Sequence, residues 1–311
     1  MKRFIITIVF FLVPVLLLLV LAEYGLRQIP NEYAYKNAWL EQNISTTEVL
    51  VLGNSYAYYG IDPAYFTGKA FNASHVSQTF KYDAYIIDKY IDRADSLKYV
   101  VLTAGYGNMI CELESGAEWW RVKKYCIYYQ CPYHKNELKF NTELIGINMF
   151  SQYVRLKNYL INGDDEIYCD TLGYGGFESS KPREMNGEDR AKKNSADLIK
   201  SAKVIEDNKV ALRHIADVLK EKNIKLLIVA PPACGDFYNA INEEQYTMSV
   251  QYYESVAESA SNVVYLNMLR DERFEEIDFT DADHLNREGA KKLTKILDEL
   301  ITQIIYRNLG L

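Results

Sequence analysis

The stretch Val49-Leu50-Val51-Leu52-Gly53-Asn54-Ser55-Tyr56-Ala57 decides the fold. Its four consecutive aliphatic residues are typical of a strand that is buried on both faces of a parallel sheet. Gly53 allows a sharp turn at the carboxyl end of this strand, where open α/β sheets bind their ligands. Ser55 is therefore a candidate nucleophile. A serine hydroxyl also needs a base within hydrogen-bond reach and a third group that orients the base.

The candidate base lies near the other end of the chain, in the segment Phe279-Thr280-Asp281-Ala282-Asp283-His284-Leu285-Asn286. Asp281 precedes His284 by three residues, so its carboxylate can bind Nδ1 and leave Nε2 facing a serine. The other three histidines lie in a predicted helix or lack an aspartate at a useful spacing: His75, His134 and His214. We expect Ser55, His284 and Asp281 to form a catalytic triad.

Between these two segments, aliphatic runs alternate with segments of helical periodicity. Four further strands are expected at residues 70–72, 97–104, 225–230 and 262–267, and the main helices at 77–94, 204–222 and 243–261 and after Asn286. Alternation of this kind predicts an α/β fold, a three-layer α/β/α sandwich around a parallel five-stranded sheet. The carboxyl ends of its strands would bring Ser55 and His284 to one edge.

The middle of the chain, about residues 107–200, has weak periodicity and many aromatic residues, including Trp119 and Trp120. A structureless loop of this length is unusual in a compact domain. We therefore expect an insertion that forms a cap over the strand ends, with residues 145–162 partly helical. The chain has 26 tyrosines, and those of the cap could stack on sugars or pack in its core.

The N-terminus carries Lys2-Arg3 and then nineteen largely apolar residues, 4–22. As a helix they extend roughly 28 Å, about the thickness of the hydrocarbon core of a bilayer. We expect a transmembrane anchor at residues 1–22, a juxtamembrane linker at 23–47 and the α/β domain at 48–311. A cleaved signal sequence and a buried helix are the alternatives. The positive residues before the span predict a cytoplasmic N-terminus and an extracytoplasmic main domain, periplasmic in a Gram-negative cell.

Composition restricts the partners. The net charge is −7 and the sequence has no block of basic residues, so nucleic acid is a poor candidate. A disulfide between Cys126 and Cys131 is sterically possible, and these two cysteines with His134 superficially resemble a zinc site. The acidic residues around Asp281 could bind calcium or magnesium. We expect neither a metal nor a cofactor.

The segments around Ser55 and His284 resemble the SGNH, or GDSL-type, hydrolase superfamily. Its nucleophile lies in a Gly-Asp-Ser motif after the first strand, matched here by Gly53-Asn54-Ser55, and its Asp-x-x-His motif is matched by Asp281 and His284. Asn54 replaces an aspartate that is not the acid of the triad. The resemblance implies the flavodoxin-like fold of that superfamily and a serine esterase mechanism.

Two further blocks of the superfamily supply donors to the oxyanion hole. The glycine of the second block falls at Ser77, and the asparagine of the third block falls at Asn108, one position late, in Gly105-Tyr106-Gly107-Asn108. The resemblance thus implies an oxyanion hole formed by Ser55, Ser77 and Asn108. Loss of one such donor typically lowers the rate about 100- to 1000-fold.

The details are most similar to membrane-anchored bacterial members that move acyl groups on cell-envelope carbohydrate. This implies an esterase or O-acyltransferase whose partners are an acylated glycan or a small acyl ester, membrane lipid and a multispanning membrane acyltransferase. Three alternatives stay open: a plain esterase or lipase with an open apolar acyl pocket, a catalytically silent glycan-binding or acyltransferase-accessory protein, and a metal-dependent hydrolase.

Overall fold

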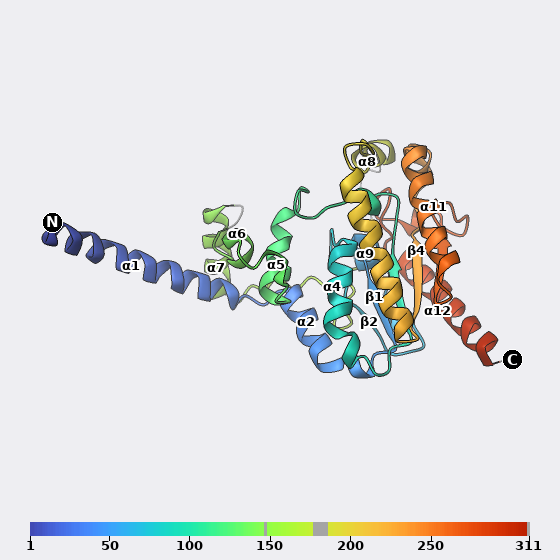
Figure 1. Ribbon diagram of the computed structural model, residues 1–311, viewed down its shortest axis with the longest axis horizontal. Helices are drawn as coiled ribbons and strands as arrows, with labels where there is room; N and C mark the ends of the chain where they lie inside the picture. Colours follow the sequence, from blue (N-terminus) through green and yellow to red (C-terminus); the bar gives the residue numbers. More distant parts are fainter. Residues whose placement is uncertain (146–147, 177–185, 310–311) are drawn as a thin grey trace. The chain divides into compact units, whose positions relative to one another are not determined.

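The computed structural model describes residues 1–145, 148–176 and 186–309 (Figure 1). Contacts divide the chain into two compact units. Unit 1 comprises Met1–Ala38 and Ala117–Tyr168, and unit 2 comprises Trp39–Gly116 and Cys169–Leu311. The segment predicted as a cap contributes to both units, and its role as a cap stays a prediction, as do the predicted domain boundaries.

Unit 2 is built on a parallel sheet of five strands in the order β2-β1-β3-β4-β5. The strands are β1 (Val49–Leu52), β2 (Ala70–Asn72), β3 (Tyr99–Thr103), β4 (Lys225–Ala230) and β5 (Val263–Asn267). All five were expected from the sequence, and the α/β fold class is confirmed. Because every strand runs in the same direction, the segments that follow β1, β3 and β4 meet at one edge of the sheet.

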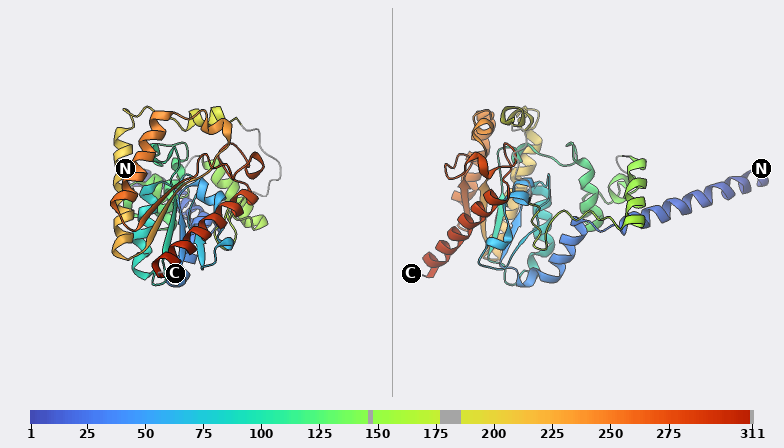
Figure 2. Two further views of the ribbon diagram at one scale, coloured as in Figure 1. Left: turned by 90° about the vertical axis from the view of Figure 1, so that its right-hand side faces the viewer. Right: turned by 180° about the vertical axis from the view of Figure 1, so that it is seen from behind.

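Helices cover both faces of this sheet (Figures 1 and 2). The helices of unit 2 are α3 (Ser55–Gly60), α4 (Phe80–Tyr90), α8 (Gly187–Lys193), α9 (Ala202–Glu221), α10 (Gly235–Tyr238), α11 (Glu243–Ser259) and α12 (Arg287–Leu309). α4 packs on α9, α9 on β4 and α11 on β5, whereas α12 packs on α3. On the α12 side, Leu293 and Leu297 join a buried cluster with Val49, Val51 and Val101. The sheet is thus buried on both faces, as its continuous aliphatic strands require.

The first and last of the predicted helices of unit 2 compare differently with their expected starts. The helix expected at residues 77–94 is α4, with a 3-10 turn at Ile91–Arg93 after it. It begins later than expected because Ser77 has φ = 61°, a left-handed conformation that does not continue into a helix. The last helix begins as expected, since the Asn286 side chain accepts hydrogen bonds from the N–H groups of Glu288 and Gly289, at 3.0 Å each.

Unit 1 contains α1 (Lys2–Arg27), α5 (Val122–Tyr128), α6 (Leu138–Asn141) and α7 (Met149–Asn162), and α2 (Glu32–Asn43) begins in it. Among the described residues, α1 is the one helix that is long and apolar enough to cross a membrane. The partly helical segment expected at residues 145–162 contains α7, and residues 146–147 of that range lie outside the described residues. The linker expected at 23–47 consists largely of the end of α1 and of α2.

Candidate active site

The turn after β1 presents Ser55 at the carboxyl edge of the sheet. Gly53 has φ = 119°, and a Cβ atom there would overlap the hydroxyl of Thr103 on β3, so only glycine fits. Asn54 is the N-cap of α3, and its side-chain oxygen accepts the N–H of Tyr56 at 3.0 Å. Ser55 is therefore the first residue of α3, held between a tight turn and a capped helix.

A buried carboxyl group on α4 stabilises this turn by a hydrogen bond to its main chain. Asp83 of α4 accepts the N–H of Gly53 at 2.9 Å and the side-chain amide of Gln78 at 2.6 Å, both on Oδ1. Burial raises the pKa of Asp83 to about 7, against the lowering effect of these two hydrogen bonds. Asp83 thus links the nucleophile turn to the residue that follows Ser77. The sequence offers no motif that would have identified it.

The loop between β5 and α12 holds His284 beside Ser55. Asp281 Oδ1 accepts the main-chain N–H groups of Asp283 at 3.2 Å and of His284 at 2.9 Å, which fixes the loop as a tight turn. The imidazole Nδ1 lies 3.0 and 3.1 Å from the two carboxylate oxygens of Asp281. Its Nε2 lies 2.8 Å from Ser55 Oγ. The structure therefore brings Asp281, His284 and Ser55 together in one hydrogen-bonded chain.

The charges of Asp281 and His284 determine which atoms of this hydrogen-bonded triad carry protons. Burial opposes ionisation of Asp281, but the hydrogen bond and charge of His284 and the two main-chain N–H groups outweigh it and lower the pKa to about 2. An ionised carboxylate only accepts hydrogen bonds, so the proton of a neutral His284 lies on Nδ1. Nε2 is then an acceptor for the Ser55 hydroxyl. This arrangement can remove the serine proton during attack on a carbonyl.

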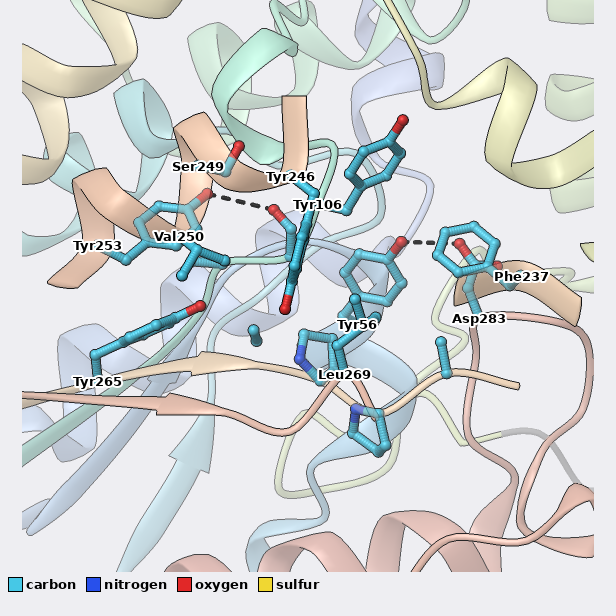
Figure 3. A pocket seen from close by; sticks show the side chains of 16 residues that line it. Tyr56, Tyr106, Phe237, Tyr246, Ser249, Val250, Tyr253, Tyr265, Leu269 and Asp283 are labelled. Atoms are coloured by element: carbon cyan, nitrogen blue, oxygen red, sulfur yellow. Dashed lines mark hydrogen bonds between the residues drawn. The ribbon is translucent and has the colours of Figure 1, made fainter. Parts of the chain in front are cut away.

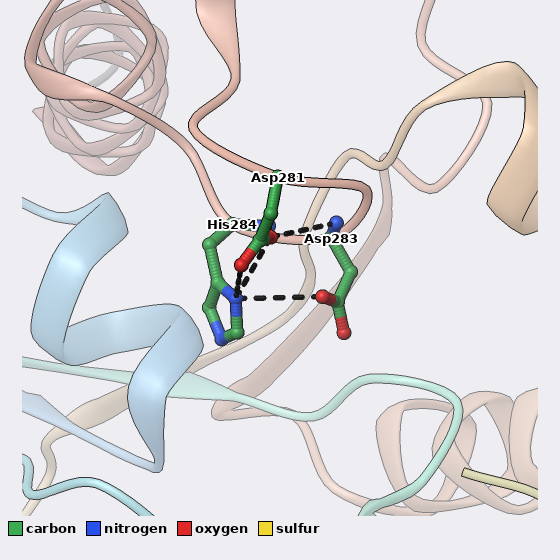
Figure 4. Close-up of side chains that lie close together, drawn as sticks. All are labelled: Asp281, Asp283 and His284. Carbon is green, nitrogen blue, oxygen red and sulfur yellow. Dashed lines mark hydrogen bonds and ion pairs between the residues drawn. The ribbon is translucent and has the colours of Figure 1, made fainter. Parts of the chain in front are cut away.

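A second carboxylate, Asp283, lies beside the same imidazole, 3.4 Å from Nδ1 (Figure 4). It accepts the hydroxyl of Tyr56 at 2.8 Å, and the Arg190 Nε lies 3.0 Å from each of its oxygens. Burial and then the charge of Asp283 raise the pKa of Tyr56 well above its usual value, so the phenol stays a donor. Sequence reasoning missed Arg190, which lies 93 residues before Asp283 without a motif.

Asp281, Asp283 and His284 are also close enough together to be considered as metal ligands. The contacts of the cluster fit a proton relay better. Arg190 already compensates the charge of Asp283, and both free directions of the imidazole are engaged, Nδ1 by Asp281 and Nε2 by Ser55. A divalent cation would have to displace Arg190 or separate His284 from Ser55. These three residues therefore do not offer a divalent cation a donor set that is free of other partners.

The expected oxyanion residues lie around this site. Asn108 accepts the N–H of Gly105 at 2.9 Å and the side-chain amide of Asn54 at 3.4 Å, while its own NH₂ group lies 3.5 Å from the carbonyl of Thr103. The side-chain amide of Asn108 thus stabilises the turn after β3. Ser77 is half-buried, and its left-handed φ of 61° is a conformation that glycine adopts more readily than serine. The roles of both residues as oxyanion donors stay predictions.

A small cavity lies behind Tyr56, at the ends of β3 and β4 (Figure 3). It measures about 10 Å³, and its lining includes several aromatic side chains, among them Tyr106, Tyr253 and Tyr265. The buried hydroxyl of Tyr265 has no hydrogen-bond partner among the described residues. This volume holds about one water molecule. The cavity is therefore not the open acyl pocket that a plain lipase requires.

Comparison with known proteins bears on the fold. A protein-family model without a functional description matches residues 185–306, and none of the curated proteins matches the sequence. The similar solved structures include a protein provisionally described as a platelet activating factor from Streptococcus pneumonia, at 10% identity and a TM-score of 0.47 over 92% of this chain and 98% of that chain. A GDSL-like lipase from Bacteroides thetaiotaomicron is 14% identical, with a TM-score of 0.43 over 89% of this chain and 99% of that one.

A third similar structure is an acetylxylan esterase from Geobacillus stearothermophilus, 11% identical, with a TM-score of 0.36 over 85% of this chain and 94% of that chain. The structural neighbours of this chain thus include GDSL-like lipases and acetylxylan esterases. At these identities the likeness concerns the fold alone. The chemistry has to be argued from the site.

Proposed function

We propose that this protein is a single-pass, extracytoplasmic SGNH-like serine esterase or O-acyltransferase that moves acyl groups, acetyl above all, on cell-envelope carbohydrate. One observation supports the chemistry: the hydrogen-bonded chain from Asp281 through His284 to Ser55, with 2.8 Å between Nε2 and Oγ. This is the distance at which a base activates a serine.

In the proposed reaction, Ser55 Oγ attacks the carbonyl carbon of an acyl ester while His284 Nε2 takes the hydroxyl proton. The tetrahedral intermediate collapses, the ester C–O bond breaks, and His284 returns the proton to the departing alcohol oxygen. A sugar hydroxyl or water then attacks the carbonyl carbon of the acyl-serine while His284 takes the proton of the attacking group. The bond between the acyl carbon and Oγ breaks, the acylated sugar or the free acid leaves, and His284 returns the proton to Ser55 Oγ. Asp281 stays ionised throughout and holds the imidazole in position.

Negative charge develops on the carbonyl oxygen in both tetrahedral intermediates. As the first residue of α3, Ser55 has a main-chain N–H with no acceptor inside the helix, and this N–H is the first proposed donor. The main-chain N–H of Ser77 is the second. This chemistry requires no cofactor and no metal.

The location is proposed from α1. Lys2 and Arg3 precede its apolar residues, which favours a cytoplasmic N-terminus and a catalytic unit on the other side of the membrane. The proposed partners are an acylated envelope glycan or small acyl ester, membrane lipid around α1 and a multispanning acyltransferase that would supply the acyl group.

The test is labelling of the full-length protein in detergent with a fluorophosphonate, followed by intact-mass measurement. We expect one adduct on the wild type and none on Ser55→Ala or His284→Ala. Ser255→Ala and His214→Ala, at exposed positions on α11 and α9, are the matched controls and should label like the wild type. An adduct that survives in Ser55→Ala would contradict the proposal.

The orientation of Asn108 favours a second candidate, a catalytically silent protein that binds glycan or assists an acyltransferase. Its amide is engaged with the main chain of Gly105 and Thr103, so a side-chain oxyanion donor is missing from its expected direction. A folded wild type that forms no adduct would favour this candidate.

A further inference from the structure

Helix α7 in unit 1 is amphipathic, but its apolar face is exposed and its polar face is buried, which is the reverse of a normal surface helix. At 100° per residue, five large apolar or aromatic side chains fall within one arc of about 120°. All five are between 60% and 70% exposed: Met149, Phe150, Tyr153, Leu160 and Ile161. A surface helix ordinarily turns such a stripe toward the core. A contiguous exposed patch of this kind marks an interaction site.

The polar side of α7 is the buried one. Gln152 is buried and accepts a hydrogen bond from Arg155. Arg155 also binds Glu166, at 2.5 and 2.9 Å, and Glu143 at 3.1 Å. Glu143 is fully buried and further paired with Lys124 at 2.8 Å. Turning the apolar face inward would break these buried pairs, which is costly. The ion pairs therefore hold the apolar face outward.

The exposed face of α7 continues the apolar surface of α1. α7 packs against the C-terminal end of α1, beside which it lies in Figures 1 and 2, and Gly25 allows the close approach of Leu156. Leu156 borders the exposed arc on the helical wheel. The carboxylate of Glu23 accepts the N–H groups of Glu143 at 3.1 Å and Leu144 at 2.8 Å, so the segment before α7 is also tied to α1.

These contacts define the depth of α7 relative to the apolar span. The span ends at Ala22, and Gly25 lies three residues later, roughly 4–5 Å further along the helix axis. If α1 crosses a bilayer, this is the level of the lipid headgroups. Tyr24, 64% exposed, lies at the same level, where tyrosine is enriched.

We propose that α7 is a membrane-interface helix, and that its exposed apolar face lies in the surface of the bilayer that α1 enters. Its apolar side chains contact the boundary between headgroups and acyl chains, as amphipathic interfacial helices do. Lys157 is exposed within the apolar arc and can extend its ammonium group to lipid phosphate. Unit 1 thus has two contacts with the membrane, one across it and one along it. This inference rests on the proposed membrane span of α1 and does not depend on the chemistry of Ser55.

The test uses the full-length chain in phosphatidylcholine–phosphatidylglycerol vesicles, with tryptophan as the depth probe. Phe150→Trp and Leu160→Trp place a tryptophan in the arc, and Ser151→Trp is the matched control, exposed on the same helix outside the arc. The tryptophan fluorescence of the wild type is subtracted from that of each variant. The remaining emission, which comes from the added tryptophan, is compared between vesicles with ordinary and with brominated acyl chains. We expect the added emission of Phe150→Trp and Leu160→Trp to be lost in brominated lipid, and that of Ser151→Trp to persist.

Equal quenching of all three variants, or none in Phe150→Trp and Leu160→Trp, would overturn the proposal. The second of these results would also be expected if another protein or a second copy covered the face. The unchanged wild type gives an independent measurement with a photoactivatable phospholipid. Adducts should appear on the peptide that contains residues 149–161 as well as on α1, and adducts on α1 alone would contradict the proposal.

Discussion

His284 Nε2 lies 2.8 Å from Ser55 Oγ, although 229 residues separate the two in the chain. The parallel sheet explains this contact, since Ser55 follows β1 and His284 lies in the loop between β5 and α12, at the same edge. Local structure holds each residue in place. Ser55 is held by the turn at Gly53 and the helix cap at Asn54, and His284 is held by the turn that Asp281 closes. The pair is therefore positioned before any substrate binds.

Replacement of the two carboxylates beside His284, one at a time, should lower kcat to different extents. Asp281→Asn should lower kcat for an activated acetyl ester by about 10⁴-fold, because an amide can donate to Nδ1 and thereby favour the wrong tautomer. Asp283→Asn should have a much smaller effect on kcat, since Asp283 is farther from Nδ1 and is compensated by Arg190. Initial rates over a range of ester concentrations check this. Equal losses in the two variants would mean that the carboxylates act as one unit.

Ser77 should act through its main chain. Its φ of 61° costs an L-residue about 1–2 kcal/mol, which glycine avoids while losing a similar amount in conformational entropy. Ser77→Gly should therefore keep both the melting temperature and the esterase rate close to wild type. Ser77→Val should lower the melting temperature, because a β-branched residue tolerates this conformation poorly. A large loss of rate in Ser77→Gly would instead assign a role to the hydroxyl.

Asn108 should contribute to stability more than to rate. Asn108→Ala leaves the buried N–H of Gly105 without its acceptor, which costs about 1–3 kcal/mol. Loss of an oxyanion donor would instead lower kcat about 100- to 1000-fold. We expect a clearly lower melting temperature and a loss of kcat well below that range. A wild-type melting temperature with a loss within that range would show that Asn108 turns its amide toward the substrate.

The sequence predicts the features that depend on local patterns. Aliphatic runs reveal the five strands, and the order of the elements places Ser55 and His284 at one edge. It does not predict Asp83 or Arg190, because a lone aspartate in a helix and a lone arginine in a polar segment become informative only through packing. The inverted face of α7 is also hidden, since its periodicity is that of an ordinary amphipathic helix and only the buried pairs of Arg155 show which side is turned inward.

Asp83 should make stability depend on pH in the direction opposite to a salt-bridged carboxylate. Its pKa is about 7 in the folded protein and about 3.9 when unfolded. Between these values the folded carboxyl holds a proton that the unfolded one has lost. Stability therefore falls as pH rises from about 4 to about 7 and then levels off, a shift that corresponds to at most roughly 4 kcal/mol.

Asp83→Asn should remove this dependence, because an amide does not ionise and its oxygen can still accept from Gly53 and Gln78. The measurement is the melting temperature of the full-length protein in detergent at pH 4.5 to 8, with Asp95→Asn as an exposed control. We expect Asp83→Asn to gain stability over the wild type progressively toward pH 7, and Asp95→Asn to follow the wild type throughout. A constant difference between Asp83→Asn and the wild type at every pH would show that Asp83 is ionised in the folded protein.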